Sequence, residues 1–130
     1  MAESALGFLL RILREERGLS LRELAQLADV DHAYVYRLET GAKESPSDEV
    51  LSKLIRALKT PKREAEMLRY LAAHPNAEAG LVAHARQDAT VTFVEFASAA
   101  GMVHRGTVRP DYATRIERVR KYLNEEDEGG

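Results

Sequence analysis

Four neighbouring residues of this chain have side chains suited to contacts with nucleic acid. His32, Ala33, Tyr36 and Arg37 follow the spacing of one exposed helical face. An Arg guanidinium can donate two hydrogen bonds to a guanine edge, an imidazole can donate to a base or a phosphate, and an Ala methyl can contact a thymine methyl. These side chains recognise a ligand by contact and hydrogen bonding, so we expect them to bind rather than to catalyse.

The segment 19–41 predicts the two short helices that would position this face. Ser20 and Glu23 have the spacing of a capping box, which opens the first helix. Asp29 lies where the turn needs a residue that tolerates left-handed backbone angles, Asp31 can cap the second helix, and Gly41 can end it. The inward apolar positions would be Leu21, Leu24, Ala25, Leu27, Val35 and Leu38. Two helices joined by a tight turn are typical of a helix-turn-helix, which reads the major groove of DNA.

The sequence from residue 6 to residue 58 resembles the lambda-repressor and Cro-like (XRE) helix-turn-helix family. The resemblance is carried by a first helix LGFLLRILREERG, the two short helices, the Glu-Thr-Gly that follows them, and Pro-Ser before DEVLSKLIRALK. It implies a structural ion pair between Arg14 and Glu39. It also implies DNA contacts, for which the candidate residues are Arg22, His32, Ala33, Tyr34, Tyr36, Arg37, Thr40 and Lys43.

Two features depart from the family pattern. Many members have Gln at the start of the first short helix to hold a phosphate, and this chain has Leu21. The loop between Gly41 and Pro46 is also one residue longer than usual. The phosphate contacts at these two places therefore do not transfer directly from the family.

Composition limits the classes of function but does not by itself indicate DNA binding. The chain has 130 residues, no Cys, and a formal net charge of −2. The absence of Cys excludes disulfides and thiolate chemistry and fits a cytoplasmic location, and no signal peptide or membrane-spanning run is expected. Because basic and acidic residues balance, a DNA-binding face must be a local patch, with Arg11, Arg22, Arg37 and Lys43 as candidate members.

The predicted fold class is all-α. We expect a five-helix lambda-repressor-like DNA-binding domain over residues 1–73, with helices near 4–17, 20–28, 31–40, 47–59 and 61–73. His74-Pro75-Asn76 would end the fifth helix and mark the boundary between the two regions. A helical C-terminal region over 74–124 would follow, and its helix opened by Thr92 also has strand-like composition. The acidic segment 125–130 is expected to be a disordered tail.

We interpret the second half mainly as a homodimerisation region. A single helix-turn-helix contacts about one turn of DNA, whereas a dimer contacts two half-sites about 34 Å apart. The expected contributors are Phe93, Phe96, Met102, Ile116, Val119 and Leu123. The alternative is that these residues pack only within their own chain.

A short basic linker in the second half has a separate resemblance. The segment 102–110, MVHRGTVRP, and the helix after it resemble the C-terminal part of DdrO and ImmR-type repressors. That resemblance implies that a metalloprotease of the ImmA/IrrE class could cut near His104, Arg105 and Gly106 and release DNA.

Other chemistry finds little support in the sequence. The four His residues lack metal-ligand spacing, no nucleophile or nucleotide-binding motif is present, and we expect no cofactor and no enzymatic activity. The leading hypothesis is a homodimeric regulator of transcription, more specifically a repressor on a palindromic operator. The alternatives are a DNA-binding antitoxin paired with a toxin, and a protein-interaction module without DNA binding.

Overall fold

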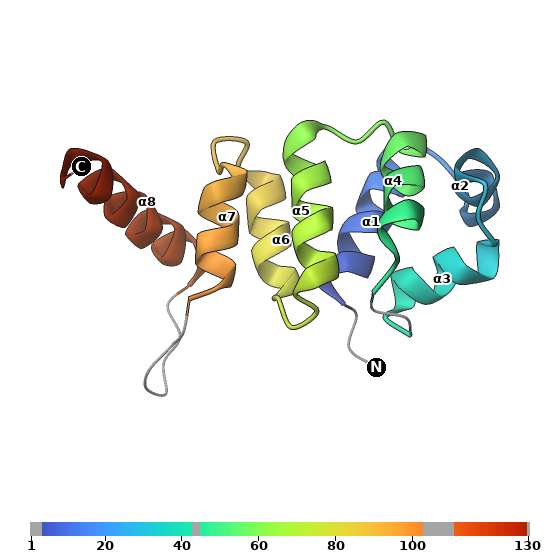
Figure 1. Ribbon diagram of the computed structural model, residues 1–130, viewed down its shortest axis with the longest axis horizontal. Helices are drawn as coiled ribbons and strands as arrows, with labels where there is room; N and C mark the ends of the chain where they lie inside the picture. Colours follow the sequence, from blue (N-terminus) through green and yellow to red (C-terminus); the bar gives the residue numbers. More distant parts are fainter. Residues whose placement is uncertain (1–3, 43–44, 103–110, 130) are drawn as a thin grey trace. The chain divides into compact units, whose positions relative to one another are not determined.

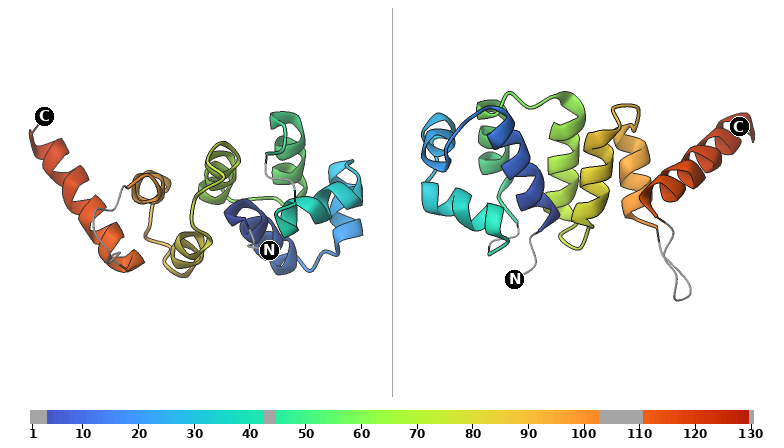
Figure 2. Two further views of the ribbon diagram at one scale, coloured as in Figure 1. Left: turned by 90° about the horizontal axis from the view of Figure 1, so that it is seen from below. Right: turned by 180° about the vertical axis from the view of Figure 1, so that it is seen from behind.

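The computed structural model describes residues 4–42, 45–102 and 111–129, and it confirms an all-α fold over them. Figures 1 and 2 show helices joined by short loops. The helices are α1 (Ala5–Glu16), α2 (Leu21–Ala28), α3 (His32–Thr40), α4 (Asp48–Ala57), α5 (Lys62–Ala73), α6 (Ala79–Gln87), α7 (Phe93–Ala100) and α8 (Tyr112–Gly129). Lys43, His104, Arg105 and Gly106 lie outside the described residues.

The chain divides into two compact units, which are described separately below. The N-terminal unit is Met1–Ala79 and the C-terminal unit is Gly80–Gly130, so the division falls six residues after the expected boundary at residue 73. The segment opened by Thr92 is a helix rather than a strand, because Thr92 and Glu95 form a complete capping box. Helix α8 continues to Gly129, past residue 125, where the disordered tail was expected to begin.

Side-chain caps explain why helices α1 to α4 begin where they do. The Ser4 and Ser47 hydroxyls accept backbone N–H groups of Gly7 and Val50 at 3.0 and 3.2 Å. Ser20 and Glu23 form the expected capping box of α2, and its hydrogen bonds hold the pKa of the Glu23 carboxyl below its usual value. Each cap satisfies a backbone donor that the helix itself leaves without a partner.

The core of the N-terminal unit is formed by one face of each helix. Helix α1 packs against α3 and α5, and α2 packs against α3 and α4. The expectation for Leu27 is wrong: its side chain is 59% exposed, because Leu24, Ala25 and Ala28 form the buried face of α2. The fully or nearly fully buried residues include Leu6, Leu9, Leu10, Leu13, Leu24, Val35, Leu38, Leu51, Leu54, Met67, Leu68 and Leu71.

Gly7 allows α1 to cross very close to the end of α3. A Cβ atom placed on Gly7 would touch the Leu38 carbonyl oxygen and lie 2.7 Å from the Glu39 carbonyl oxygen. These are backbone atoms of a capped helix, so they cannot move aside as a flexible side chain can. The close contact between α1 and α3 therefore requires Gly at this position.

An ion pair between Arg14 and Glu39 joins the same two helices. The Arg14 Nε atom donates to Glu39 Oε2 at 2.7 Å, Nη2 donates to Oε1 at 2.9 Å, and Nη1 donates to the Leu19 carbonyl oxygen at 2.9 Å. The Glu39 side chain is only 6% exposed. Hydrogen bonding to Glu39 raises the pKa of the Arg14 guanidinium above its ordinary value. One side chain thus links α1, the start of the α2 segment and the end of α3.

The C-terminal unit packs α7 against α8. Three of the six residues expected at a dimer interface, Phe96, Ile116 and Val119, are at most 5% exposed within the single chain. Packing within the chain already covers these three side chains, and their contribution to a dimer interface stays a prediction. Phe93, Met102 and Leu123 are half-buried.

Polar contacts also hold α8 in the C-terminal unit. The buried Arg115 donates from Nη2 to the Ala99 carbonyl oxygen at 2.8 Å, near the end of α7. Arg120 donates from Nε to Glu95 Oε2 at 3.1 Å and from Nη2 to the Thr90 hydroxyl at 3.0 Å. These bonds fix α8 against α7 by directional contacts in addition to apolar packing.

We predict that Gly7→Ala destabilises the protein by about 2 kcal/mol or more, because overpacking against an immobile backbone forces α1 and α3 apart. Gly18→Ala is the matched control, since its Cβ would meet nothing within 4 Å and would suffer only from the positive φ of 67°. We expect that control to cost about 1 kcal/mol. Urea unfolding measures both variants, and an equal loss would contradict the steric explanation.

We predict that Glu39→Ala costs about 3 kcal/mol in unfolding free energy, because it leaves the partly buried Arg14 charge without its carboxylate. The double variant Arg14→Leu with Glu39→Leu should lose less, because neither charge then remains. Glu49→Ala, which removes an exposed pair with Lys53 at 3.8 Å, should cost less than about 1 kcal/mol. Thermal or urea unfolding distinguishes these outcomes, and a Glu39→Ala loss no larger than that of the control would refute the structural role.

Candidate nucleic-acid interface

Helix α3 presents the candidate recognition residues on one side and its anchors on the other. The Asp31 carboxylate caps the helix by accepting the Ala33 backbone N–H at 3.0 Å, and Gly41 ends it with φ 83°. Val35 and Leu38 are fully buried. Since these anchors fix the helix, the opposite face is held rigidly toward solvent.

The structure places the predicted DNA-binding residues of α3 on or beside that solvent face. The His32 side chain is 55% exposed, Tyr36 is 55% exposed, and Arg37 is exposed. Ala33, Tyr34 and Thr40 are partly exposed, and the Thr40 hydroxyl donates to the Arg37 carbonyl oxygen at 3.3 Å. The exposed imidazole, phenol and guanidinium provide hydrogen-bond donors along one helix face.

The turn between α2 and α3 has the backbone that the sequence predicts. Asp29 adopts the left-handed conformation with φ 57° and ψ 50°, and the Val30 N–H donates to the Ala25 carbonyl oxygen at 3.0 Å. Asp is one of the few residues besides Gly that tolerate these angles. The turn fixes the direction in which α3 leaves α2.

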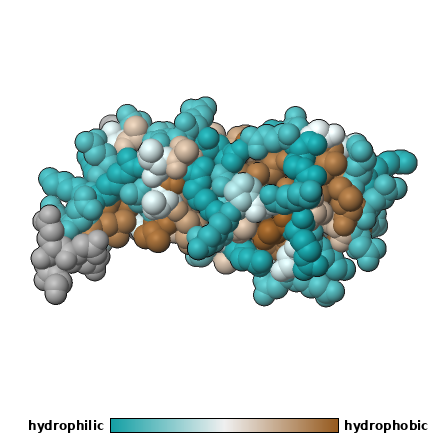
Figure 3. Space-filling view, turned by 90° about the horizontal axis from the view of Figure 1, so that it is seen from above, coloured by the Kyte–Doolittle hydropathy of each residue, from teal (hydrophilic) through white to brown (hydrophobic). Residues whose placement is uncertain are grey.

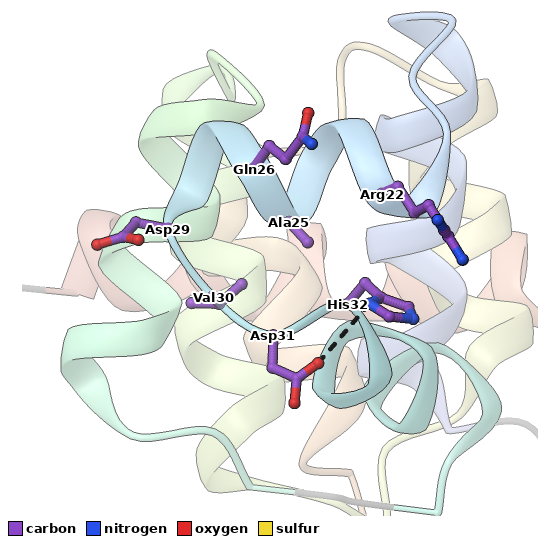
Figure 4. Close-up of a pocket in the computed structure, with 7 residues that line it drawn as sticks. All are labelled: Arg22, Ala25, Gln26, Asp29, Val30, Asp31 and His32. Carbon is purple, nitrogen blue, oxygen red and sulfur yellow. Dashed lines mark ion pairs between the residues drawn. The ribbon is translucent and has the colours of Figure 1, made fainter.

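An open concavity of about 610 Å³ lies between α2 and the start of α3 (Figure 4). In Figure 4, the side chains of Arg22 from α2 and His32 from α3 lie on the same side of this concavity, while Asp29 lies on the other side of the turn. The His32 Nδ1 atom is 3.8 Å from an Asp31 carboxylate oxygen. Two of the predicted contact residues are thus brought together from separate helices. The lining residues are Arg22, Ala25, Gln26, Asp29, Val30, Asp31 and His32.

Gln26 is a candidate contact residue that the sequence reasoning missed. Its side chain is exposed and lines the concavity with Arg22 and His32. The available signal was its spacing, because Gln26 follows Arg22 by four residues and therefore shares a face of α2 with it. A side-chain amide can pair with an adenine edge, so this position can add to recognition.

Leu21 occupies the place where the family pattern has a polar residue. It lines a second open concavity of about 650 Å³, which includes both partners of the Arg14–Glu39 ion pair. Arg11, at the rim, forms an ion pair with Glu15 at 3.4 Å. Arg11 and Arg22 lie near this end of α2, and Arg14 is bound by Glu39, so a phosphate here would meet guanidinium groups rather than an amide. The lining residues are Arg11, Arg14, Leu21, Tyr36, Glu39, Thr40 and Ala42.

The described residues form neither a metal site nor a membrane-spanning helix. In residues 4–42, 45–102 and 111–129, no cluster of three or more His, Cys, Asp or Glu side chains has the geometry to hold a metal ion. Over the same residues, no helix has both the length and the apolar character needed to cross a membrane.

Comparison with known proteins agrees with the geometry of the N-terminal unit. Residues 5–68 match the family described as a helix-turn-helix domain. Over 55 residues the chain is 42% identical to the HTH-type transcriptional repressor RghR of Bacillus subtilis (strain 168). That match covers 42% of this chain and 41% of the relative, so the similarity spans less than half of either protein. The matched region contains α1 to α4, with the capped recognition helix and the Arg14–Glu39 ion pair at its centre. Residues 5–68 therefore form a helix-turn-helix domain of the lambda-repressor and Cro-like (XRE) family.

Proposed function

We propose that this protein is a DNA-binding transcription regulator that places α3 in the major groove. The observation that carries the proposal is the exposed face of α3, in which His32, Tyr36 and Arg37 point outward from a helix anchored by Val35 and Leu38. An α-helix fits the major groove, and side chains on its exposed face reach base edges. The likeness to a relative named as a transcriptional repressor supports regulation by repression, and we place the protein with DNA in the cytoplasm.

Within this proposal the contact residues have different roles. Arg37 is our candidate for a bidentate contact with guanine, and Ala33 for a contact with a thymine methyl. Arg22 and His32, which lie beside the same concavity in Figure 4, are our candidates for holding a phosphate. Phosphate contacts fix the register of the helix on the duplex, whereas the base contacts supply sequence preference.

We further propose that the protein acts as a homodimer on a palindromic operator. One copy of α3 reads a single half-site, and two copies related by a twofold axis would read two half-sites about one helical turn apart. Phe93, Met102 and Leu123 keep half-buried apolar surface, and Val94 and Tyr122 are 56% and 62% exposed. These side chains leave the C-terminal unit with apolar area that a second copy could cover.

Selection of duplexes from a random pool tests the proposed function. We expect enrichment of a symmetric sequence whose half-site centres lie about 34 Å apart, because that distance places both half-sites on one side of the DNA. Enrichment of a single asymmetric site would contradict the dimer. A pool that yields no enriched sequence at low salt would refute DNA recognition itself.

We predict that Arg37→Ala lowers affinity for the selected operator and relaxes preference at one base pair by about 1–3 kcal/mol. Fluorescence anisotropy with the operator and with single-base variants measures this effect. Arg69→Ala is the matched control, since Arg69 is exposed on α5 and lines neither of the two concavities near α3. Unchanged discrimination in Arg37→Ala would remove this residue from base readout.

A further inference from the structure

A cationic groove lies on the N-terminal unit where the ends of α1, α2 and α4 meet. Its basic members are Arg17 after α1, Lys53 and Arg56 on α4, and Lys59 after α4, and its volume is about 560 Å³. The groove contains no residue of α3. The name cationic groove is used below for these four basic residues together with Leu27. Its full lining is Arg17, Leu27, Ala28, Asp29, Lys53, Arg56, Ala57 and Lys59.

Local structure accounts for some of these charges. Arg17 donates from Nη1 to the Ala57 carbonyl oxygen at 3.0 Å, near the end of α4, and Lys53 pairs with Glu49 at 3.8 Å. Basic residues near helix C-termini are also favoured by the helix dipole. These roles explain a positive charge at each helix end, but they do not explain an apolar side chain among the charges.

Leu27 is the feature that points to a ligand. It is 59% exposed, whereas Leu24, Ala25 and Ala28 of the same helix are buried and Leu21 at its start is half-buried. Lys59 adds a second unusual feature, since it adopts a positive φ of 50°, which Gly or Asn would adopt at lower cost. The groove therefore combines an apolar contact point with surrounding cations, and a complementary ligand would combine an apolar side chain with several acidic groups. Figure 3 shows apolar side chains exposed among hydrophilic ones on this protein's surface.

The end of α8 has this complementary composition. Residues 125–128 are Glu-Glu-Asp-Glu, the only run of four acidic residues in the sequence. Tyr122 is 62% exposed and precedes the exposed Glu125 by three residues, so these two side chains share a face of α8. One helix end thus offers a ring for Leu27 and carboxylates for the surrounding cations.

We propose that the acidic end of α8 from a second copy of this chain binds the cationic groove. Each copy would then donate one helix end and accept one, which closes the pair by a twofold axis. Double-stranded DNA is the less suitable occupant, because Leu27 and Asp29 would face its phosphates. Since α3 lies outside the groove, the recognition face stays free for DNA. The inference deepens the proposed homodimer by naming where the two copies meet.

Reciprocal charge reversal tests the inference on the full chain. One variant carries Arg56→Glu with Lys59→Glu, a second carries Glu125→Lys with Glu126→Lys, and a third combines all four substitutions. The matched control carries Lys62→Glu with Arg69→Glu, which makes the same charge change on exposed residues of α5 outside the groove. Sedimentation velocity at physiological salt measures the dimer dissociation constant, and circular dichroism checks that each variant is folded.

We expect each reversal in the groove or helix end to weaken the dimer at least about tenfold, and the combined variant to recover most of that loss, because opposite charges face each other again. The control should stay within about threefold of the wild type. Failure of the combined variant to recover, or an equal effect in the control, would overturn the inference. A monomeric wild-type chain would also overturn the inference. If the charge reversals then change the compactness of that monomer, the end of α8 binds the groove of its own chain.

Leu27→Ser gives a second measurement that does not depend on charge. We expect it to weaken the dimer about tenfold without lowering thermal stability, since the exposed Leu27 contributes little to the core. Operator binding separates this inference from the proposed function. A dimer that binds the selected palindrome and ignores all of these substitutions would refute the groove and leave the DNA-binding proposal intact.

Discussion

The contact between α1 and α3 is the constraint on which the rest of the N-terminal unit depends. Gly7 lets the two helices approach so closely that a Cβ atom at this position would clash with the Leu38 carbonyl oxygen, and the Arg14–Glu39 ion pair, with the added bond to Leu19, ties α1 to the end of α3. A recognition helix is useful only when its exposed side chains have defined directions, because a base edge accepts hydrogen bonds over a narrow range of geometry. Under the proposed function, the ion pair would hold the reading face in place rather than touch DNA.

Basic residues gather in local patches on this protein, although the chain as a whole is slightly acidic. The net charge is −2, yet Arg22 and His32 lie together beside the start of α3, and four other cations surround Leu27 at the ends of α1, α2 and α4. Screening limits exposed charges to a range of about 8 Å at physiological salt, so the local sign matters more than the sum. A protein of this net charge can thus offer separate cationic surfaces to different acidic ligands.

The C-terminal unit shows that an apolar sequence pattern does not by itself identify an interface with a second copy. Phe96, Ile116 and Val119 have the spacing of an interface face, but packing within the chain covers them. An apolar stripe records only that a face is buried, because a neighbouring helix of the same chain and a helix of a second copy bury it equally well. What remains for a partner is the surface left exposed after that packing, including Val94 and Tyr122.

The sequence by itself determined the local elements of this protein. Capping residues such as Ser20, Asp31 and Thr92, the left-handed turn at Asp29 and the stop at Gly41 act through atoms a few residues apart, so their types and spacing predict them. The likeness to a known family supplied the Arg14–Glu39 pair. Only the tertiary structure decided which apolar residues are buried, as with the exposed Leu27, and which distant residues share a surface, as with Arg22 and His32. The physical reason is that helical periodicity fixes the face on which a side chain lies, while the crossing of other helices decides whether that face is covered.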